Sequence, residues 1–472
     1  MIFRQLLDSD LGCASYLIGD AGRGVVVDPG VDVERIIAAA DEEGVRIELV
    51  LETHAHADHV SGRALLAEQT GARLRLPAGG GYEDGAGDEL RGGDEIALGS
   101  LRITALAAPG HRPEHLVLLV ADTSRSAEPW MLLSGDSLLV GDLARPDLAI
   151  DGVEGARGLH ETLSRLAQLP DGVELWPGHV GGSLCGGPGL SRKPSSTLGF
   201  ERATNPLLAA GLGPDELAER LLASLPDRPP TVAHVVARNR TPAPAAARQV
   251  ARLSGAQLAE ALGSRTLLDA RPAVELDAAI PSLTLLDARS AVDFDAAHLP
   301  GAVSLALQGN GLGTRAAWVI APDEGFVVQA ADEASALELV RRLRAVGLER
   351  VRGIAVGPVE QLALDGGVTV EAVSPITVEE LPSLARSVTI VDVRDELEWR
   401  DGHFADAVHL PLSRLRAKAD TLPAGPLATI CKSGARAAFA ASWLRAQGHD
   451  ARRVTGGGIL DLPTVGLDLV VS

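Results

Sequence analysis

Four side chains that can bind a metal ion lie within six residues near the start of the chain. They are His54, His56, Asp58 and His59, and they directly follow the apolar run 47–51. Imidazoles two residues apart at the end of a strand can converge on one ion once the chain turns, and an Asp-His pair just beyond can reach the same ion or a neighbour. Because a core strand has no use for such a cluster, the pattern predicts a metal centre where a strand gives way to a loop.

Three further candidate ligands each follow an apolar strand and stand beside a glycine. They are His111, Asp136 and His179. Ligands at strand ends are held rigidly, while the adjoining loops leave space for a substrate. One such histidine would mean little by itself, but several of these elements in order favour one shared site.

The order and spacing of these seven residues resemble the signature of the metallo-β-lactamase superfamily, which implies an αββα sandwich with the metal at one edge of two sheets. Within that superfamily, the stretches 135–148 and 177–187 resemble the persulfide dioxygenase branch. This resemblance implies a single iron(II), with zinc as the alternative, held by His54, His111 and Asp136. Two imidazoles and one carboxylate leave positions open for dioxygen and a thiol-derived ligand.

The other polar residues of the signature have two interpretations. His56, Asp58, His59 and His179 either orient the ligands and bind water or substrate, or hold a second metal ion as in the hydrolytic relatives. The resemblance also places Arg145 near the thiol substrate. There its guanidinium would clamp a carboxylate, and a surface arginine beside a proline is the simpler alternative.

The chain has three cysteines, Cys13, Cys185 and Cys431, and their odd number and wide separation favour single thiols in a reducing compartment. Cys185 follows His179 in a Gly-rich loop, where the multidomain relatives typically have a cysteine. We expect it to touch or relay the persulfide, against the simpler view of a buried inert residue. Cys13 has no such context and is interpreted as a packing residue.

Cys431 stands between a strand-like segment, 427–430, and a strongly helical one, 437–447. At such a turn the free backbone N–H groups, helped by Lys432 and Arg436, stabilise an anionic sulfur and activate the thiol as a nucleophile. The loop and the elements before it resemble the rhodanese sulfurtransferases. The segment 456–460 departs from that family, because it lacks the tryptophan commonly found there.

The C-terminal half contains this pattern twice. The repeated elements, with the same Asp-to-His spacing, are Asp287, Arg289 and His298 in the first copy and Asp392, Arg394 and His403 in the second. Such a duplication indicates two copies of one α/β unit. The first copy has no cysteine in the segment 326–332, so it is interpreted as a degenerate rhodanese domain without chemistry of its own.

The elements that must position these residues follow from local patterning. Before residue 235, short β-like segments alternate with helical ones at 33–43 and 61–70, which is typical of layered α/β domains. Prolines then punctuate residues 226–244, which predicts an arm or linker between domains. We therefore expect all of the metal chemistry to lie before this arm.

The length and net charge of the chain limit the number of domains and the kinds of partner that can be expected. The chain of 472 residues predicts about three domains at about 150 residues each. A net charge of −20 repels phosphate backbones, so no nucleic-acid partner is expected. No apolar run approaches the roughly 20 residues that cross a bilayer, and the first residues lack the features of a secretory signal. We expect a cytoplasmic protein that acts on small molecules and does not contact membranes.

The resemblances together imply an α/β multidomain protein: a metallo-β-lactamase sandwich at 1–240, a degenerate rhodanese domain at 256–365 and an active one at 374–472. The iron site would use dioxygen to oxidise a low-molecular-weight persulfide, of the glutathione, mycothiol or coenzyme A type, to sulfite. Cys431 would pass sulfane sulfur to that sulfite, giving thiosulfate, or run in reverse to supply the iron site. Homo-oligomers are expected on family grounds.

Two other functions fit the same residues. A glyoxalase-II-like thioester hydrolase would use the full set of superfamily ligands to hold two zinc or iron ions that activate water. A sulfur-carrier or sensing module would bind persulfides in the metal domain and pass sulfur from Cys431 to a protein partner. The metal content and stoichiometry distinguish the hydrolase from the dioxygenase. Absence of oxygen uptake would favour the sulfur-carrier or sensing module.

Overall fold

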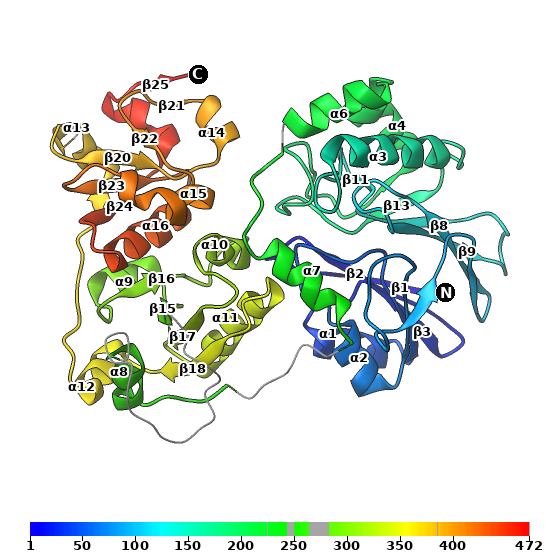
Figure 1. Ribbon diagram of the computed structural model, residues 1–472, viewed down its shortest axis with the longest axis horizontal. Coiled ribbons are helices and arrows are strands. Elements are labelled where there is room, and N and C mark those ends of the chain that lie inside the picture. Colours follow the sequence, from blue (N-terminus) through cyan, green and yellow to red (C-terminus); the bar gives the residue numbers. More distant parts are fainter. Residues whose placement is uncertain (224, 243–249, 264–282, 385, 472) are drawn as a thin grey trace. The chain divides into compact units, whose positions relative to one another are not determined.

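The computed structural model describes residues 1–223, 225–242, 250–263, 283–384 and 386–471 (Figure 1). The chain forms two compact units, and each is described by itself. The first contains residues 1–227, 232–247 and 345–347, and the second contains the remainder. Within the described residues, no helix is long and apolar enough to cross a membrane.

Two six-stranded sheets form the first unit. The first sheet has the order β1 (Ile2–Leu7), β2 (Ala14–Asp20), β3 (Arg23–Val27), β4 (Arg46–Leu51), β5 (Arg73–Pro77), β6 (Asp88–Leu90). The second has the order β14 (Ser196–Thr197), β13 (Glu174–Pro177), β10 (Met131–Gly135), β9 (Leu116–Asp122), β8 (Leu101–Ala107), β7 (Glu95–Leu98). A short ribbon pairs β11 (Leu138–Leu139) with β12 (Asp142–Leu143).

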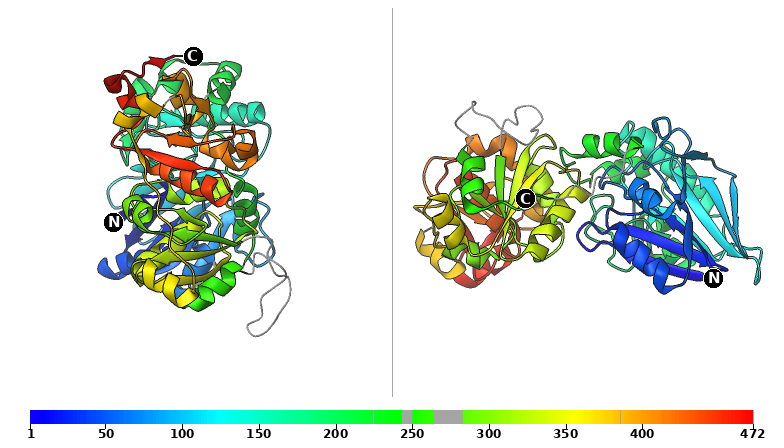
Figure 2. Two further views of the ribbon diagram at one scale, coloured as in Figure 1. Left: turned by 90° about the vertical axis from the view of Figure 1, so that its left-hand side faces the viewer. Right: turned by 90° about the horizontal axis from the view of Figure 1, so that it is seen from below.

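Helices cover the outer faces of both sheets (Figures 1 and 2). The helices of this unit are α1 (Val33–Glu42), α2 (Arg63–Thr70), α3 (Gly152–Leu166), α4 (Leu198–Thr204), α5 (Pro206–Ala209), α6 (Pro214–Ala223) and α7 (Val232–Arg240). The helices predicted at 33–43 and 61–70 are thereby confirmed to within two residues. The second ends at Gly71, whose φ of +72° is the left-handed conformation that glycine adopts readily.

Alternating side chains hold the four layers together. On β2, Tyr16 and Ile18 point into the core between the sheets, whereas Leu17 packs with Ile36 of α1 on the outer face. On the second sheet, Leu118 faces the shared core and Val117 packs toward the α3 side. Successive strand residues point to opposite faces, so a strand covered on both faces is apolar throughout. This is the predicted αββα sandwich.

The predicted arm is wrong for residues 232–240, which form α7. Asn239 of this helix is 2% exposed, and its Nδ2 donates to the carbonyls of His56 and His59 at 2.9 and 2.8 Å. Its Oδ1 accepts from Ser61 N at 2.9 Å. The segment thus fixes the backbone of the metal loop instead of lying beyond it.

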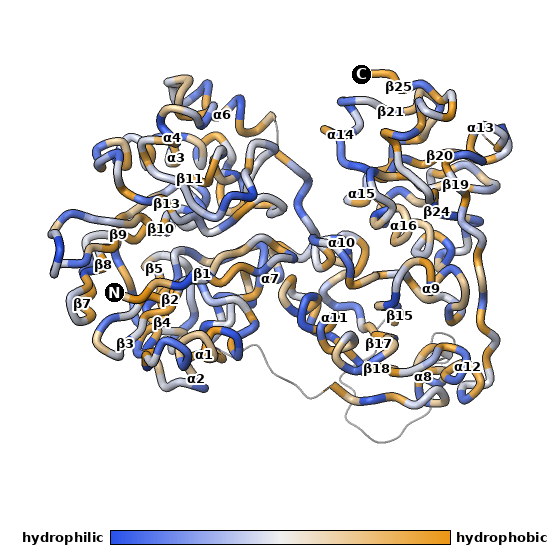
Figure 3. The backbone as a smooth tube through the Cα atoms, turned by 180° about the vertical axis from the view of Figure 1, so that it is seen from behind, coloured by the Kyte–Doolittle hydropathy of each residue, from blue (hydrophilic) through white to orange (hydrophobic). Residues whose placement is uncertain are grey.

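The second unit contains two parallel sheets. The first has the order β16 (Ala302–Ser304), β15 (Leu283–Asp287), β17 (Gly325–Ala330), β18 (Val351–Val356). The second has the order β19 (Ile376–Thr377), β24 (Ala451–Thr455), β23 (Leu427–Ile430), β20 (Thr389–Asp392), β22 (Val408–His409), and β21 (His403–Phe404) pairs with β25 (Leu469–Val470). Hydrophobic residues, orange in Figure 3, supply the buried strands of both sheets.

Helices pack around these sheets. Around the first are α8 (Gly255–Gly263), α9 (Ala291–Ala296), α10 (Leu312–Val319), α11 (Glu333–Ala345) and α12 (Val359–Gly366). Around the second are α13 (Leu381–Leu384), α14 (Glu396–Arg400), α15 (Leu412–Lys418), α16 (Ala435–Ala446), and the 3₁₀ turns η1 (Val378–Glu380), η2 (Ala419–Thr421) and η3 (Ile459–Val465). Part of the predicted copy at 256–365, residues 264–282, lies outside the described residues.

The repeated sequence elements perform the same structural task in both sheets. The Arg289 guanidinium donates to Asp287 Oδ2 at 2.6 Å and to the Ala297 carbonyl at 2.7 Å. Arg394 makes the matching bonds, to Asp392 Oδ2 at 2.6 Å and to the Gly402 carbonyl at 2.8 Å. The repeat therefore braces the loop that follows β15 in one sheet and the loop that follows β20 in the other.

Candidate metal centre and thiol site

The three predicted iron ligands converge at one edge of the sandwich. His54 follows β4, His111 lies between β8 and β9, and Asp136 follows β10. From Asp136 Oδ2, His54 Nε2 is 3.8 Å away and His111 Nε2 is 3.5 Å away. All three side chains are fully buried. The three atoms could hold one ion between them.

The far side of each imidazole is fixed by a hydrogen bond. His111 Nδ1 lies 2.8 Å from the carbonyl of Arg145, which can only accept, so this nitrogen carries the proton. Asp28 accepts from Thr53 Oγ1 at 2.8 Å, so Thr53 in turn accepts from His54 Nδ1 at 2.9 Å. Both imidazoles therefore turn a bare Nε2 lone pair toward Asp136.

These inward atoms lack hydrogen-bond partners among the described residues. They are His54 Nε2, His111 Nε2 and Asp136 Oδ2. Buried polar atoms are almost always hydrogen-bonded, so three converging exceptions need an explanation. The donor set fits a divalent metal ion, with ligands oriented from behind as in known metal sites.

Burial keeps the ligands in their metal-binding forms. Burial, followed by the charges of neighbouring histidines, lowers the pKa of His54 well below its usual value, and burial also lowers the pKa of His111. Burial alone would raise the pKa of Asp136, but the charge of His179 and its hydrogen bond bring it below the usual range. Neutral imidazoles and an ionised carboxylate are the forms that bind metals.

Glycine is required beside Asp136. Gly135 has a φ of +48°, and a Cβ there would stand 2.6 Å from His115 Nε2. A Cβ on Gly178 would stand 2.6 Å from Asp136 Oδ1. Both distances are too short for real atoms, so the glycines noted in the sequence allow neighbouring chains to approach the carboxylate closely.

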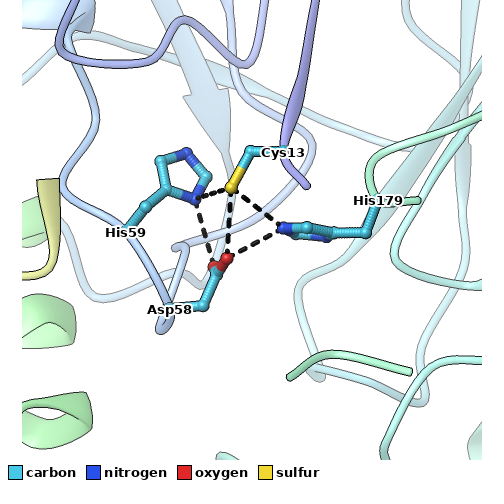
Figure 4. A group of neighbouring side chains, drawn as sticks. All are labelled: Cys13, Asp58, His59 and His179. Atoms are coloured by element: carbon cyan, nitrogen blue, oxygen red, sulfur yellow. Dashed lines mark hydrogen bonds and ion pairs between the residues drawn. The ribbon is translucent and has the colours of Figure 1, made fainter. Parts of the chain in front are cut away.

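Asp58, His59 and His179 gather in a second group, together with Cys13 (Figure 4). Cys13 Sγ lies 3.4 Å from Asp58 Oδ2, 3.5 Å from His59 Nδ1 and 3.3 Å from His179 Nε2. The sequence interpretation of Cys13 as a packing residue missed this position. Its only sequence signal was its place at the end of a strand, which many packing residues share.

The centroid of the His56 ring lies 4.1 Å from that of His54 and 4.3 Å from that of His59, and its Nε2 faces two carboxylates. Its Nε2 is 2.8 Å from Glu52 Oε2 and 3.2 Å from Asp28 Oδ1. Burial and the charge of His59 lower the pKa of His56, but Asp28 and Glu52 outweigh them and raise it to about 9. Sequence reasoning missed both acids, and the part that His56 plays at the metal site stays a prediction.

Arg145 and Cys185 are both buried near the ligands. The Arg145 guanidinium pairs with Asp147, with Nε 2.7 Å from Oδ1, so its contact with the ligand group is made by its carbonyl. The donor atoms of Cys185, His179 and Asp136 lie within 4.8 Å of one another. Burial raises the pKa of Cys185 well above its usual value, which keeps its thiol neutral. A role for either side chain in substrate binding stays a prediction.

Cys431 lies at the carboxyl end of β23, directly before α16. It is 1% exposed, and Gly434 N donates to its Sγ at 3.1 Å, as expected for a loop that stabilises a sulfur anion. Lys432 is exposed. Arg436 donates two hydrogen bonds to Glu398, which the sequence did not reveal.

Gly458 supports this thiol loop from the far side. A Cβ on Gly458 would lie 2.2 Å from the Lys432 carbonyl oxygen and 2.6 Å from that of Cys431. The next residue, Ile459, donates from its N to the Cys431 carbonyl at 3.0 Å. The Gly-rich segment without the expected tryptophan therefore packs its bare backbone directly against the loop.

The chain belongs to the metallo-β-lactamase superfamily through its N-terminal domain, which a rhodanese-like domain follows. The profile of the Metallo-beta-lactamase superfamily matches residues 8–179, and that of the Rhodanese-like domain matches residues 377–459. A solved metallo-beta-lactamase from Staphylococcus aureus subsp. aureus COL is 26% identical, with a TM-score of 0.64, and the match covers 76% of this chain and 99% of that chain.

Two curated relatives differ in function. A hydroxyacylglutathione hydrolase from Anaeromyxobacter dehalogenans is 33% identical over 167 residues, covering 35% of this chain and 60% of that protein. The mitochondrial persulfide dioxygenase ETHE1 of Bos taurus is 27% identical over 212 residues, covering 44% of this chain and 76% of that protein. The chain spans 56–61% of the length of three hydroxyacylglutathione hydrolases that it matches, and 78% of a fourth, from Rhodobacter capsulatus, to which it is 31% identical over 216 residues.

Proposed function

We propose that the metal domain oxidises a low-molecular-weight thiol persulfide to sulfite, and that the rhodanese-like domain transfers sulfane sulfur through Cys431. The observation that carries the proposal is the donor set of His54, His111 and Asp136, whose three inward atoms are buried without partners. This is the two-histidine, one-carboxylate face typical of iron(II) oxygenases, with positions left for two small ligands. The likeness to a persulfide dioxygenase over 76% of its length supports the same chemistry.

One persulfide, one dioxygen and one water give one thiol and one sulfurous acid, so no further oxidant is needed. Iron(II) bound by the three ligands supplies the redox chemistry of this step. The residues around it do the remaining work. Thr53 and the Arg145 carbonyl hold the two imidazoles in the tautomer that exposes Nε2. His179 holds the far oxygen of Asp136 at 2.6 Å, which fixes the orientation of the carboxylate.

The thiol site follows from the geometry of the Cys431 loop. The Cys431 thiolate attacks the sulfane sulfur of a second persulfide, and the free thiol leaves. Sulfite then takes this sulfur from the Cys431 persulfide, which releases thiosulfate and regenerates the thiolate. The Gly434 N–H, 3.1 Å from Sγ, stabilises the anionic sulfur before and after transfer. In the reverse direction the same loop would make persulfide for the metal domain.

A second candidate is hydrolysis of a glutathione thioester. It is favoured by the second group of donors beside the first, and by 33% identity to a hydroxyacylglutathione hydrolase. In that case the two donor groups would each hold an ion, and the ions would activate water as the nucleophile. The two functions differ in their need for dioxygen.

The deciding experiment is oxygen consumption by the iron-loaded full chain with glutathione persulfide, set beside hydrolysis of a hydroxyacylglutathione. We expect oxygen uptake with sulfite and thiosulfate as products, and loss of uptake in Asp136→Ala. Cys431→Ser is the matched control, because it leaves the metal ligands intact and should keep the uptake. Thioester hydrolysis without oxygen uptake would assign the hydrolase instead.

A further inference from the structure

We infer that the first copy of the repeat, which has no cysteine in its loop, binds a low-molecular-weight thiol of the glutathione class without reacting with it. The inference rests on the proposed function, because the bound thiol would be the carrier whose persulfide the other domains use. A cavity of about 570 Å³ lies in this copy. None of the described residues that line it belongs to the donor groups of the metal domain or to the loop of Cys431.

The cavity lies at the carboxyl end of the first parallel sheet (Figure 1). The strands β15, β16, β17 and β18 all run in the same direction, so their carboxyl ends share one edge. Lining segments end or follow each of these strands, and they are 288–290, 307–308, 330–331 and 357–360. Sheets of this kind bind ligands outside this edge, and small-molecule sites have volumes of about 300–1,000 Å³. The cavity therefore has the place and the size of a ligand site.

The register of the strands shows which residue of the first copy is equivalent to Cys431. Asp287 pairs with the last residue of β17 that β15 contacts, and Ala330 comes next. Asp392 pairs in the same way with the last residue of β23 that β20 contacts, and Cys431 comes next. Ala330 therefore stands where the second copy has its sulfur, and it lines the cavity.

A shorter loop adds to the space left by the missing sulfur. Residues 331–332 connect β17 to α11, whereas residues 431–434 connect β23 to α16. The buried alanines Ala288 and Ala330 line the cavity with methyl groups. The sulfur of a bound thiol can occupy the place of the lost side chain, and no cysteine is present among the described lining residues to exchange with it.

The polar groups of the cavity suit an amino-acid zwitterion. Arg289 donates from Nε and Nη2 to Asp287, and from Nη2 to the Ala297 carbonyl, which leaves Nη1 to donate to a carboxylate. Asp293 and Glu360 line the same cavity, are exposed, and would attract an ammonium group. A thiol of the glutathione class carries both groups.

The same charges disfavour coenzyme A. Among the described residues of the lining, Arg289 is the only basic one, and its charge is balanced by Asp287. The carboxylates of Asp293 and Glu360 would repel the phosphates of coenzyme A. The inference therefore selects one class among the carrier thiols.

Calorimetric titration of the full chain with reduced glutathione, under anaerobic conditions, tests the site. We expect Ala331→Trp, which places an indole in the cavity, to lose one equivalent of bound glutathione relative to the wild type. Ala424→Trp is the matched control, because this alanine is also exposed in a bend but does not line the cavity. Glu360→Lys should weaken glutathione binding about tenfold, the effect of losing a bond between charged groups, and should strengthen binding of coenzyme A.

A second measurement locates the ligand without a bulky substitution. In a Cys431→Ser background, the thiolate of Ala331→Cys attacks glutathione disulfide, forming a mixed disulfide and releasing one glutathione. Mass spectrometry should show this reaction to be at least tenfold faster than that of Ala424→Cys and to saturate with glutathione disulfide, since binding precedes exchange.

Each contrary outcome overturns the site. A wild type that binds no glutathione at millimolar concentration would do so, as would equal binding by Ala331→Trp, equal exchange rates at the two positions, or tighter binding of coenzyme A than of glutathione to this cavity. Oxygen uptake is measured separately. Its absence with glutathione binding intact would refute the proposed function and the role of the ligand as its carrier, whereas uptake without this binding would refute the cavity alone.

Discussion

The Asp136 carboxylate lies 2.6 Å from the imidazole of His179, measured from Oδ1 to Nδ1, while its other oxygen faces His54 and His111. The other nitrogen of His179 lies among the donors around Cys13. One imidazole therefore joins the two donor groups, and a change at His179 acts on both.

His179→Ala should weaken iron binding about 10- to 100-fold, the usual effect of losing a group that orients a ligand. The reason is that Asp136 Oδ1 loses its only ring donor and the carboxylate can rotate. Equilibrium titration of the full chain with iron(II) under anaerobic conditions measures the affinity. An unchanged iron affinity would show that Asp136 is fixed by other contacts. His160→Ala, a half-buried residue of α3 that is not among the donor groups, is the control.

Asn239→Leu should lower the free energy of unfolding by about 2–4 kcal/mol, because buried polar groups left unpaired cost about 1–3 kcal/mol each. The variant removes the partners of the His56 and His59 carbonyls and of Ser61 N. Thermal unfolding of the metal-free chain measures the loss. The matched control is Asn310→Leu in the second unit, and an equal effect of the two substitutions would contradict the assigned role.

Cys431→Ser should spare oxygen uptake and divert the product from thiosulfate to sulfite, with at least a tenfold fall in thiosulfate. Serine cannot carry a sulfane sulfur, so sulfite accumulates. Chromatography of the sulfur anions formed from glutathione persulfide checks this. An equal thiosulfate yield from the variant would refute the role given to the thiol.

Gly458→Ala should reduce sulfur transfer by about 100-fold, since a displacement of about 1 Å at a reacting group has an effect of that size. The new Cβ would collide with the Lys432 and Cys431 carbonyl oxygens and push the loop out of position. Sulfur transfer from thiosulfate to cyanide measures the change. Gly263→Ala, which meets nothing within 4 Å, should leave the rate unaltered.

The Glu398–Arg436 pair predicts an acid-sensitive contribution to stability. Burial raises the pKa of Glu398, but hydrogen bonds from Arg436 outweigh it and lower the pKa from 4.5 to about 2. Because the folded value lies below the ordinary one, the pair contributes fully above about pH 4.5 and the contribution disappears as the pH falls toward 2.

Glu398→Gln should therefore cost about 1–3 kcal/mol at pH 7 and progressively less below pH 4.5, an amount that allows for partial exposure of the pair. Urea unfolding of the full chain at pH 7, 4 and 3, followed by tryptophan fluorescence, gives the difference. Glu396→Gln, whose carboxylate is 43% exposed and meets Arg400, His409 and Arg414 at 3.4 Å or more, should change stability by less than about 0.5 kcal/mol. A pH-independent difference for Glu398→Gln would contradict the assignment.

The alternation of strand-like and helical segments predicted layered α/β structure, and the resemblance to the metallo-β-lactamase superfamily implied the sandwich and the grouping of His54, His111 and Asp136. Each of these residues ends an apolar strand, and strand ends that share a sheet edge must meet. Contacts made by chain pairing over long separations were not predictable. Cys13 meets His179, 166 residues later, through a single isolated bridge that leaves no periodic signal.

The type of a side chain does not by itself give the direction in which it points, or show that the backbone of the same residue makes the important contact. The spacing of His54 and His56 cannot say which imidazole turns toward the metal, because Glu52 and Asp28, which hold His56, are ordinary acids in the sequence. The substrate-binding role of the Arg145 guanidinium stays a prediction, whereas the carbonyl of the same residue, a group that every residue possesses, accepts from His111 Nδ1. Asn239 lay in a proline-rich stretch that local composition marked as linker.

Helix α16, which follows Cys431, packs against strand β16 of the first parallel sheet, whose copy of the sequence repeat has no thiol. Ser304 N, on the edge strand β16, donates to Ser442 Oγ of α16 at 2.9 Å, and both residues are 3% exposed. The small side chains along α16 let this strand come close. A fragment beginning at residue 374 would expose that face to water and loosen the helix whose start cradles the reactive sulfur. The first parallel sheet therefore contributes to the stability of the helix that follows Cys431.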